Sequence, residues 1–165
     1  MKEHTYKVGV TWIGNDGEGT KGYRSYRRDH VIEVVGKQPI AGSSDPVFRG
    51  DPTRHNPEDL LVASLSACHM LMYLHLCAVN RVNVVAYTDA ASGIMREKPD
   101  GAGEFASVQL MPTVTISSGS DPAKAEELHH QAHEKCFIAN SVKFPVEVTP
   151  EIVLENEQKP EASVA

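Results

Sequence analysis

The stretch HNPEDLLVASLSACHMLMYLHLCAVN, residues 55–80, predicts the central helix of the fold. Asn56 suits the N-cap and Pro57 the first helical position, and the acidic residues that follow favour the positive end of the helix dipole. Residues 60–79 are long enough to span a membrane, but polar side chains interrupt them, namely Ser64, Ser66, His69, Tyr73 and His75. Because polar groups without partners are costly in lipid, we expect a buried helix and no contact with a membrane.

Strands and a second helix are predicted around this helix. Alternating and β-branched segments predict strands at 5–13, 81–95, 105–118 and 142–155, and one or two strands within 29–42. Residues 121–141 predict a second helix, with Asp121 as its cap and Pro122 at its first position. This order predicts an α+β fold. We expect one domain over 1–154 and a disordered tail over 155–165.

Composition limits the classes of partner. The chain has 165 residues and a net charge of −6, and no cluster of Lys and Arg contradicts that acidity, so a nucleic-acid partner is not expected. Three cysteines fit poorly with a secreted disulfide framework, and the N-terminus lacks the apolar region of a signal peptide. We therefore expect a cytoplasmic protein.

The cysteines differ in their surroundings. Cys68 and Cys77 are nine residues apart, and at about 100° per residue they face opposite sides of a helix, with a rise between them of about 13 Å. Cys77 is interpreted as a small core hydrophobe. Cys68 is flanked by small residues, and a thiol becomes reactive where a cation stabilises its anion. Candidate cations are Arg24, Arg27, Arg28 and His69.

Two segments resemble the OsmC/Ohr family of thiol-dependent peroxidases. In that family Asn-Pro-Glu opens the helix and the peroxidatic cysteine follows ten residues after the glutamate, a spacing that NPEDLLVASLSAC keeps with Glu58 and Cys68. AHEKCFIANS, residues 132–141, resembles the segment around the second family cysteine, here Cys136. The chain departs from the family at Phe137, where proline is frequent, at His69, and in the long connection GIMREKPDGAGEF.

The resemblance implies a fold, an assembly and an activity. The fold would be OsmC-like, with antiparallel sheets packed around two central helices in an intertwined homodimer. The activity would be reduction of organic hydroperoxides to alcohols, without a cofactor, through a sulfenic acid at Cys68 and a Cys68–Cys136 disulfide. A dithiol such as a lipoyl group would be the reductant. A catalytic arginine is also implied, and we favour Arg28 over Arg24 and Arg27.

Glu58 is expected to hold that guanidinium in a bidentate pair. Ten residues of straight helix place Glu58 about 15 Å from Cys68, too far for one compact site. Either the helix breaks between them, or Glu58 serves the Cys68 of another subunit, which agrees with the implied homodimer.

Two other functions remain open. His129, His133 and Cys136 are spaced to share one helical face, and Cys68 would complete a tetrahedral zinc set. The chain would alternatively be a non-catalytic binding protein that keeps the fold. Loss of one redox cysteine would signal that class, and both cysteines are present.

Overall fold

Helix α1, Pro57–Val79, begins where the sequence predicts and is continuous. The backbone N–H of Asp59 donates to Oδ1 of Asn56 at 2.7 Å, and the Asn56 N–H donates to the Asp59 carboxylate at 3.4 Å, which together form a reciprocal cap. By length and composition alone α1 qualifies as a membrane span, with a mean hydropathy of 1.7 over its most apolar window. Core helices pass the same test, and this one buries a face made of Leu65, His69, Tyr73, Leu76 and Cys77.

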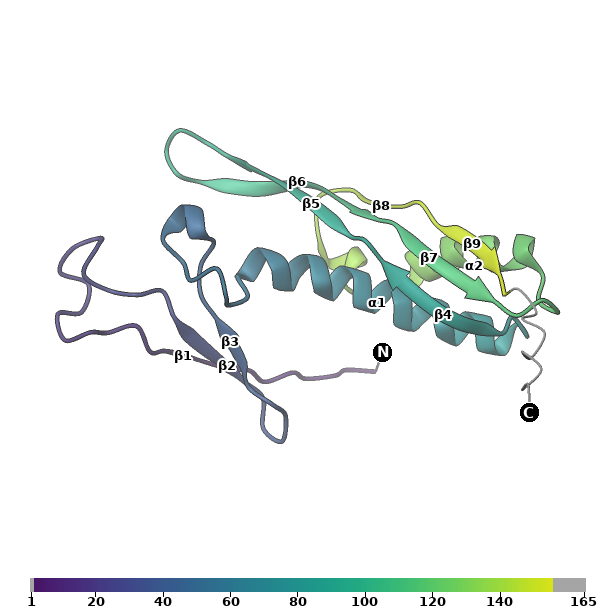
Figure 1. The fold of residues 1–165 in the computed structure, drawn as a ribbon, viewed down its shortest axis with the longest axis horizontal. Helices are drawn as coiled ribbons and strands as arrows, with labels where there is room; N and C mark the ends of the chain where they lie inside the picture. Colours follow the sequence, from purple (N-terminus) through teal and green to yellow (C-terminus); the bar gives the residue numbers. More distant parts are fainter. Residues whose placement is uncertain (1, 156–165) are drawn as a thin grey trace, which may run out of the picture. The chain divides into compact units, whose positions relative to one another are not determined.

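The computed structural model describes residues 2–155 (Figure 1). The chain divides into two units, residues 1–61 and 62–165. A single domain over 1–154 therefore stays a prediction. The tail predicted at 155–165 lies outside the described residues except for Glu155, whose N–H donates to the Ile116 carbonyl at 2.7 Å.

The first unit carries a three-stranded antiparallel sheet in the order β1-β2-β3. Its strands are β1 (Gly9–Trp12), β2 (His30–Glu33) and β3 (Ile40–Gly42), and a short 3-10 helix, η1, follows at Pro46–Phe48. The strand predicted at 5–13 is shortened because Gly9 pairs with Glu33, and the β2–β3 turn begins at Val34. Residues 5–8 thus have no strand of this sheet to pair with.

In the second unit, two segments predicted as single strands are each divided. The first gives β4 (Val84–Asp89) and β5 (Ser92–Glu97), and the second gives β6 (Gly103–Leu110) and β7 (Pro112–Ile116). At the second break the Asp89 side chain accepts a hydrogen bond from the Met111 N–H at 2.8 Å, and Pro112 has no N–H to give. β4 pairs with β7 and β5 with β6, all antiparallel.

The closing strand is also divided. β8 (Val146–Val148) pairs with β6, and β9 (Glu151–Leu154) pairs with β7, and both pairings are parallel. Two sheets result, β4-β7-β9 and β5-β6-β8. The predicted α+β fold with two helices is confirmed, while the two parallel pairings were not foreseen.

Helix α2, Pro122–Lys135, starts as predicted, with the Asp121 carboxylate accepting from the N–H groups of Ala123 and Lys124. It ends earlier than the predicted 141, because Cys136 adopts an extended conformation and a short 3-10 helix, η2, follows at Ala139–Ser141. Both helices pack against the β4-β7-β9 sheet, whose β9 strand lies beside α2 (Figure 1). The core there comprises Tyr73, Leu76, Cys77, Val82, Val114, Ile116, Ala125, Leu128 and Ala132.

Candidate active site

Cys68 and Cys136 are brought together from the two helices. Cys68 lies on α1 and is partly buried, whereas Cys136 caps the C-terminus of α2 and is 1% exposed. Burial, and then a hydrogen bond with the Cys68 side chain, raise the pKa of Cys136 to about 11. The Ala139 N–H reaches Cys136 Sγ at 3.5 Å. Two thiols far apart in the sequence therefore form one contact pair.

Cys77 belongs to the core, as its helical spacing predicted. It is 1% exposed and sits in the cluster around Tyr73 and Leu76. Burial raises the pKa of the Cys77 thiol, which keeps it protonated at neutral pH. Such a thiol is a poor nucleophile.

A buried pair of histidines joins the two helices, His69 from α1 and His129 from α2. His69 directly follows Cys68 in the sequence. His69 Nε2 and His129 Nδ1 are 2.9 Å apart and hydrogen-bonded, and the Tyr73 ring stacks on His129 with centroids 3.7 Å apart. Burial is the main cause that lowers the pKa of His69 to about 4 and that of His129 to about 3. Both rings are therefore neutral at neutral pH. The sequence offered His69 as a candidate cation for Cys68, and this lowered pKa removes it from that role.

The Asp89 side chain links α1 to the break between β6 and β7 through two hydrogen bonds. Its Oδ2 accepts from the Ser66 hydroxyl at 2.5 Å while its Oδ1 accepts from the Met111 N–H. Ser66 lies two residues before Cys68. This anchor fixes the segment of α1 that carries the thiol.

The four residues of the alternative zinc site do not gather. Among residues 2–155, no three His, Cys, Asp or Glu side chains are arranged to hold a metal ion. The His129 ring is turned into the helix interface toward His69, and Cys136 has left the helical face on which the spacing argument depended.

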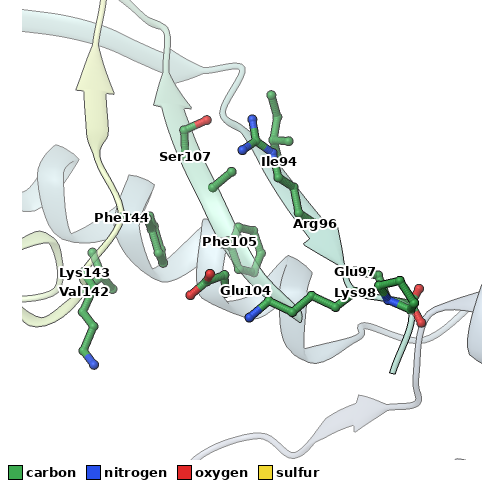
Figure 2. A pocket seen from close by; sticks show the side chains of 12 residues that line it. Ile94, Arg96, Glu97, Lys98, Glu104, Phe105, Ser107, Val142, Lys143 and Phe144 are labelled. Carbon is green, nitrogen blue, oxygen red and sulfur yellow. The ribbon is translucent and has the colours of Figure 1, made fainter. Parts of the chain in front are cut away.

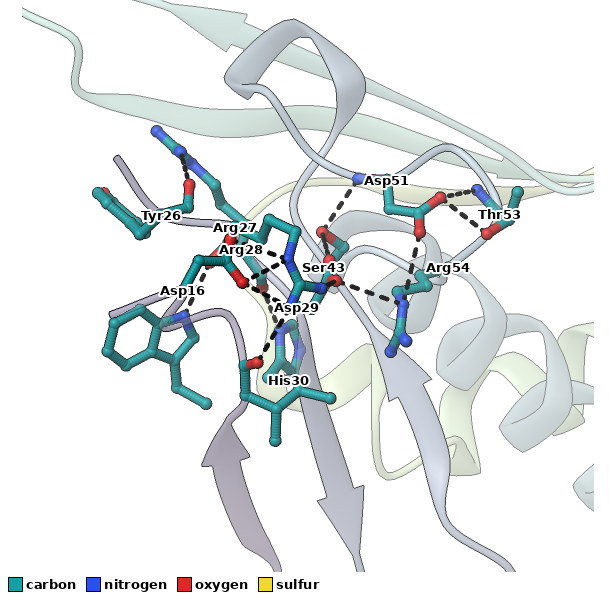
Figure 3. Close-up of polar contacts among 12 residues, drawn as sticks. Asp16, Tyr26, Arg27, Arg28, Asp29, His30, Ser43, Asp51, Thr53 and Arg54 are labelled. Carbon is teal, nitrogen blue, oxygen red and sulfur yellow. Dashed lines mark hydrogen bonds and ion pairs between the residues drawn. The ribbon is translucent and has the colours of Figure 1, made fainter. Parts of the chain in front are cut away.

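Two of the three candidate arginines, Arg27 and Arg28, are engaged in contacts within the first unit (Figure 3), and Arg24 is exposed. Arg28 donates to the carbonyls of Tyr26 and Tyr23 at 2.6 and 2.8 Å, and its guanidinium lies over both of their rings. Arg27 forms ion pairs with Asp16 and Asp29. The assignment of Arg28 to the site stays a prediction.

Glu58 lies in the first turn of α1 and is partly buried. Within the described residues 2–155 its side chain has neither a hydrogen bond nor an ion pair. Because α1 is unbroken from Pro57 to Val79, the alternative of a helix break between Glu58 and Cys68 is wrong. A role for Glu58 in another subunit's site stays a prediction.

A groove of about 860 Å³ runs between the β5–β6 hairpin and residues 142–144 (Figure 2). The rings of Phe105 and Phe144 lie 5.4 Å apart in its wall, and Arg96, Lys98 and Lys143 bring positive charge. Both rings pack against a buried cluster of Leu65, Val108, Leu110 and Val146, as do Ile138 and Ala139, which follow Cys136 in the sequence. The sequence gave no signal for this groove beyond the long connection at 93–105.

Comparisons with known proteins agree with this fold. A family model described as OsmC-like protein matches residues 50–151. The structure of an OsmC-like protein of unknown function from Vibrio cholerae is 38% identical, with a TM-score of 0.79, covering 91% of this chain and 99% of that chain. No curated protein matches the chain.

Two more distant structures share the fold. An organic hydroperoxide resistance protein from Legionella pneumophila is 19% identical with a TM-score of 0.64, covering 92% of this chain and 99% of that chain. Another, from Elizabethkingia anophelis, is 18% identical with a TM-score of 0.64, covering 93% and 100%.

Proposed function

Because the chain belongs to the OsmC-like protein family, we propose that it is a thiol-dependent peroxidase that reduces organic hydroperoxides through Cys68 and Cys136. The observation that carries the proposal is the contact between these two thiols, which the third cysteine does not share. The names of the Legionella and Elizabethkingia proteins, organic hydroperoxide resistance proteins, support the choice of substrate.

The chemistry needs one thiol that attacks the peroxide and a second thiol that resolves the sulfenic acid. The Cys68 thiolate attacks the terminal peroxide oxygen, so that the S–O bond forms, the O–O bond breaks, and the alkoxide leaves and is protonated to the alcohol. Cys136 then attacks the sulfur of the sulfenic acid, forming the S–S bond and releasing the hydroxide, which takes the Cys136 proton as water. A dithiol reductant of lipoyl type would return two electrons and two protons.

Burial supports an order for the two thiols in the proposed mechanism. With its pKa raised to about 11, Cys136 is protonated at neutral pH and is not the group that meets the peroxide first. Cys68 is more accessible, since Cys136 is 1% exposed and Cys68 is only partly buried. Cys68 is thus the attacking thiol and Cys136 the resolving thiol.

A homodimer is part of the proposal. In residues 2–61 the buried side chains are polar, namely Asp29, Ser43 and Asn56. Apolar side chains of β1 stay open, with Val10 65% and Trp12 42% exposed. A three-stranded sheet needs a covered apolar face for stability. We assign that cover to a second copy, whose Cys68 would meet Glu58 across the interface.

A cytoplasmic location fits the same chemistry, because working thiols must be returned to the reduced state after each turnover. The groove lined by Phe105 and Phe144 suits the apolar part of an organic hydroperoxide.

The deciding experiment is a dithiol-driven peroxidase assay of the purified protein with tert-butyl hydroperoxide and with hydrogen peroxide. We expect turnover on both and a higher kcat/KM for the organic substrate. Absence of turnover on either would refute the proposal and would favour a non-catalytic protein that keeps the family fold.

A further inference from the structure

The backbone that follows α2 turns back onto the sulfur of Cys136. The helix ends at Lys135, and Cys136 itself is extended, with φ −71° and ψ 111°. The chain then reverses, and the Ala139 N–H donates to Cys136 Sγ at 3.5 Å. A second backbone hydrogen bond to this thiol comes from Ile138. Residues 136–141 thus form a turn, here called the thiol turn, that offers two N–H donors to one sulfur.

Two exposed polar side chains hold the thiol turn in place. Asn140 Nδ2 donates to the Glu134 carbonyl in the last turn of α2 at 2.9 Å, and the Asn140 N–H donates to the Cys136 carbonyl at 3.0 Å. The Ser141 hydroxyl donates to the Phe137 carbonyl at 2.7 Å. Each bond joins a late residue of the turn to an earlier part of the chain, so the path around Cys136 is fixed from the surface of the protein.

Cys136 needs such donors because water does not solvate its sulfur. The residue is 1% exposed, and burial, followed by the contact with Cys68, raises the pKa of the Cys136 thiol to about 11. At pH 7 only roughly one molecule in ten thousand therefore carries the thiolate. The thiolate is nevertheless the form that attacks sulfur. The hydrogen bonds from Ile138 and Ala139 act in the opposite direction to burial and lower the pKa of this thiol.

We propose that the thiol turn is what makes Cys136 a resolving nucleophile, and that Asn140 is the positioning residue that holds the turn. The assignment rests on the proposed function. The two N–H groups stabilise the charge that develops on Sγ as the thiol loses its proton. The thiolate forms the S–S bond to Cys68, the S–O bond of the sulfenic acid breaks, and the departing hydroxide takes up the proton as water. No further oxidant or reductant enters this step.

The end of α1 supplies a matched control. There Asn80 Nδ2 donates to the Leu76 carbonyl at 2.8 Å, the same kind of bond that Asn140 makes at the end of α2. Asn80 is exposed and lies twelve residues beyond Cys68. Asn80→Ala therefore removes an equivalent bond at a helix end that does not carry the resolving thiol.

The first test follows one turnover at tert-butyl hydroperoxide concentrations where the attack by Cys68 is fast. Two rates are measured by acid quenching and peptide mapping, namely hydroperoxide loss and formation of the Cys68–Cys136 disulfide. We expect Asn140→Ala and Ser141→Ala to slow disulfide formation at least about threefold and to leave hydroperoxide loss unchanged. A rise of about one unit in the thiol pKa lowers the thiolate fraction about tenfold and raises its intrinsic reactivity about threefold, which gives this factor. Asn80→Ala should change neither rate.

A second measurement separates anion stabilisation from mere loosening of the turn, and it needs no peroxide. Pulsed iodoacetamide alkylation of Cys136 is followed against pH in a Cys68→Ser background. A looser turn alone would speed alkylation at every pH without moving the midpoint. Loss of anion stabilisation raises the midpoint, and we expect a rise of about half a pH unit or more in Asn140→Ala and in Ser141→Ala. Asn80→Ala should leave the midpoint in place.

Two results would overturn the assignment. One is an unchanged alkylation midpoint in Asn140→Ala, and the other is an equal slowing of disulfide formation in Asn80→Ala. If the wild-type protein consumes no hydroperoxide, the proposed function fails. The alkylation midpoints then still decide whether the thiol turn stabilises the Cys136 thiolate.

Discussion

The neutral histidine pair between the two helices should make the protein sensitive to mild acid. His69 is fully buried and His129 is 2% exposed, and their pKa values are lowered from 6.5 to about 4 and about 3. Burial is the main cause for both. His133 adds to the lowering for His69, and His69 and His130 add to it for His129, while Asp89 opposes it for His69.

The sign follows from linkage. In the unfolded chain both histidines take up protons as the pH falls through 6.5, but in the folded protein they stay neutral until about 4 and about 3. Below pH 6.5 the unfolded state therefore binds more protons than the folded state, and the free energy of unfolding decreases as the pH is lowered. The pair makes no pH-dependent change above about pH 7, and its effect grows as the pH falls toward the folded pKa values.

The size can be worked out at pH 5. That pH is about 1.5 units below the unfolded value, and each unit is worth about 1.36 kcal/mol. Each histidine then removes about 2 kcal/mol from the free energy of unfolding, and the pair removes about 4 kcal/mol relative to pH 8. Folded proteins typically have a free energy of unfolding of roughly 5–15 kcal/mol, so this loss is a large part of the total.

The assay is urea unfolding between pH 8 and pH 5 at a fixed protomer concentration. His129→Phe keeps a ring against Tyr73 and removes one titrating group, so its loss between pH 8 and pH 5 should be smaller than that of the wild type by about 2 kcal/mol. His75→Gln, an exposed change on α1, should follow the wild type. If His129→Phe and the wild type lose the same free energy over this range, the reasoning is wrong.

Three further predictions concern the thiols and the assembly. Cys68→Ser should abolish hydroperoxide consumption, whereas Cys77→Ala should leave it largely intact because Cys77 lies in the core; equal losses would show that Cys77 takes part. A modest peroxide excess should form a Cys68–Cys136 disulfide within one chain, detected by non-reducing peptide mapping; a crosslink to Cys77, or stoichiometric zinc with both thiols still reduced, would count against the mechanism. Hybrid dimers of Glu58→Ala and Cys68→Ser chains should regain one working site, while either homodimer has none; hybrids that form but stay inactive would place Glu58 and Cys68 in one chain's site.

Local signals predicted the helix starts correctly, because a cap depends on residues within one turn. Asn56 with Pro57 and Asp121 with Pro122 are examples, and both cap as expected. The α+β fold followed from the order of the elements. The breaks in the long strands did not, because the interruption at Met111 comes from a carboxylate 22 positions away.

Contacts between distant residues were out of reach of the sequence. The parallel pairings of β8 with β6 and of β9 with β7 depend on where the chain returns after α2, and no local pattern encodes them. The sequence also gave no hint that Arg54 lies beside Asp29, which is 25 positions earlier. The Cys68–Cys136 pair itself was predicted only through the family resemblance.

The buried histidines also bear on why these two thiols meet. His69 follows Cys68 on α1, and His129 lies on α2 seven residues before Cys136. Hydrocarbon contacts are non-directional and tolerate small shifts of one helix along another. The hydrogen bond at 2.9 Å and the ring stack on Tyr73 are directional. Since His69 Nδ1 and His129 Nε2 are already buried without a partner, a shift would leave the other two ring nitrogens unpaired as well. The pair thus opposes shifts of α1 along α2, the two helices that carry Cys68 and Cys136.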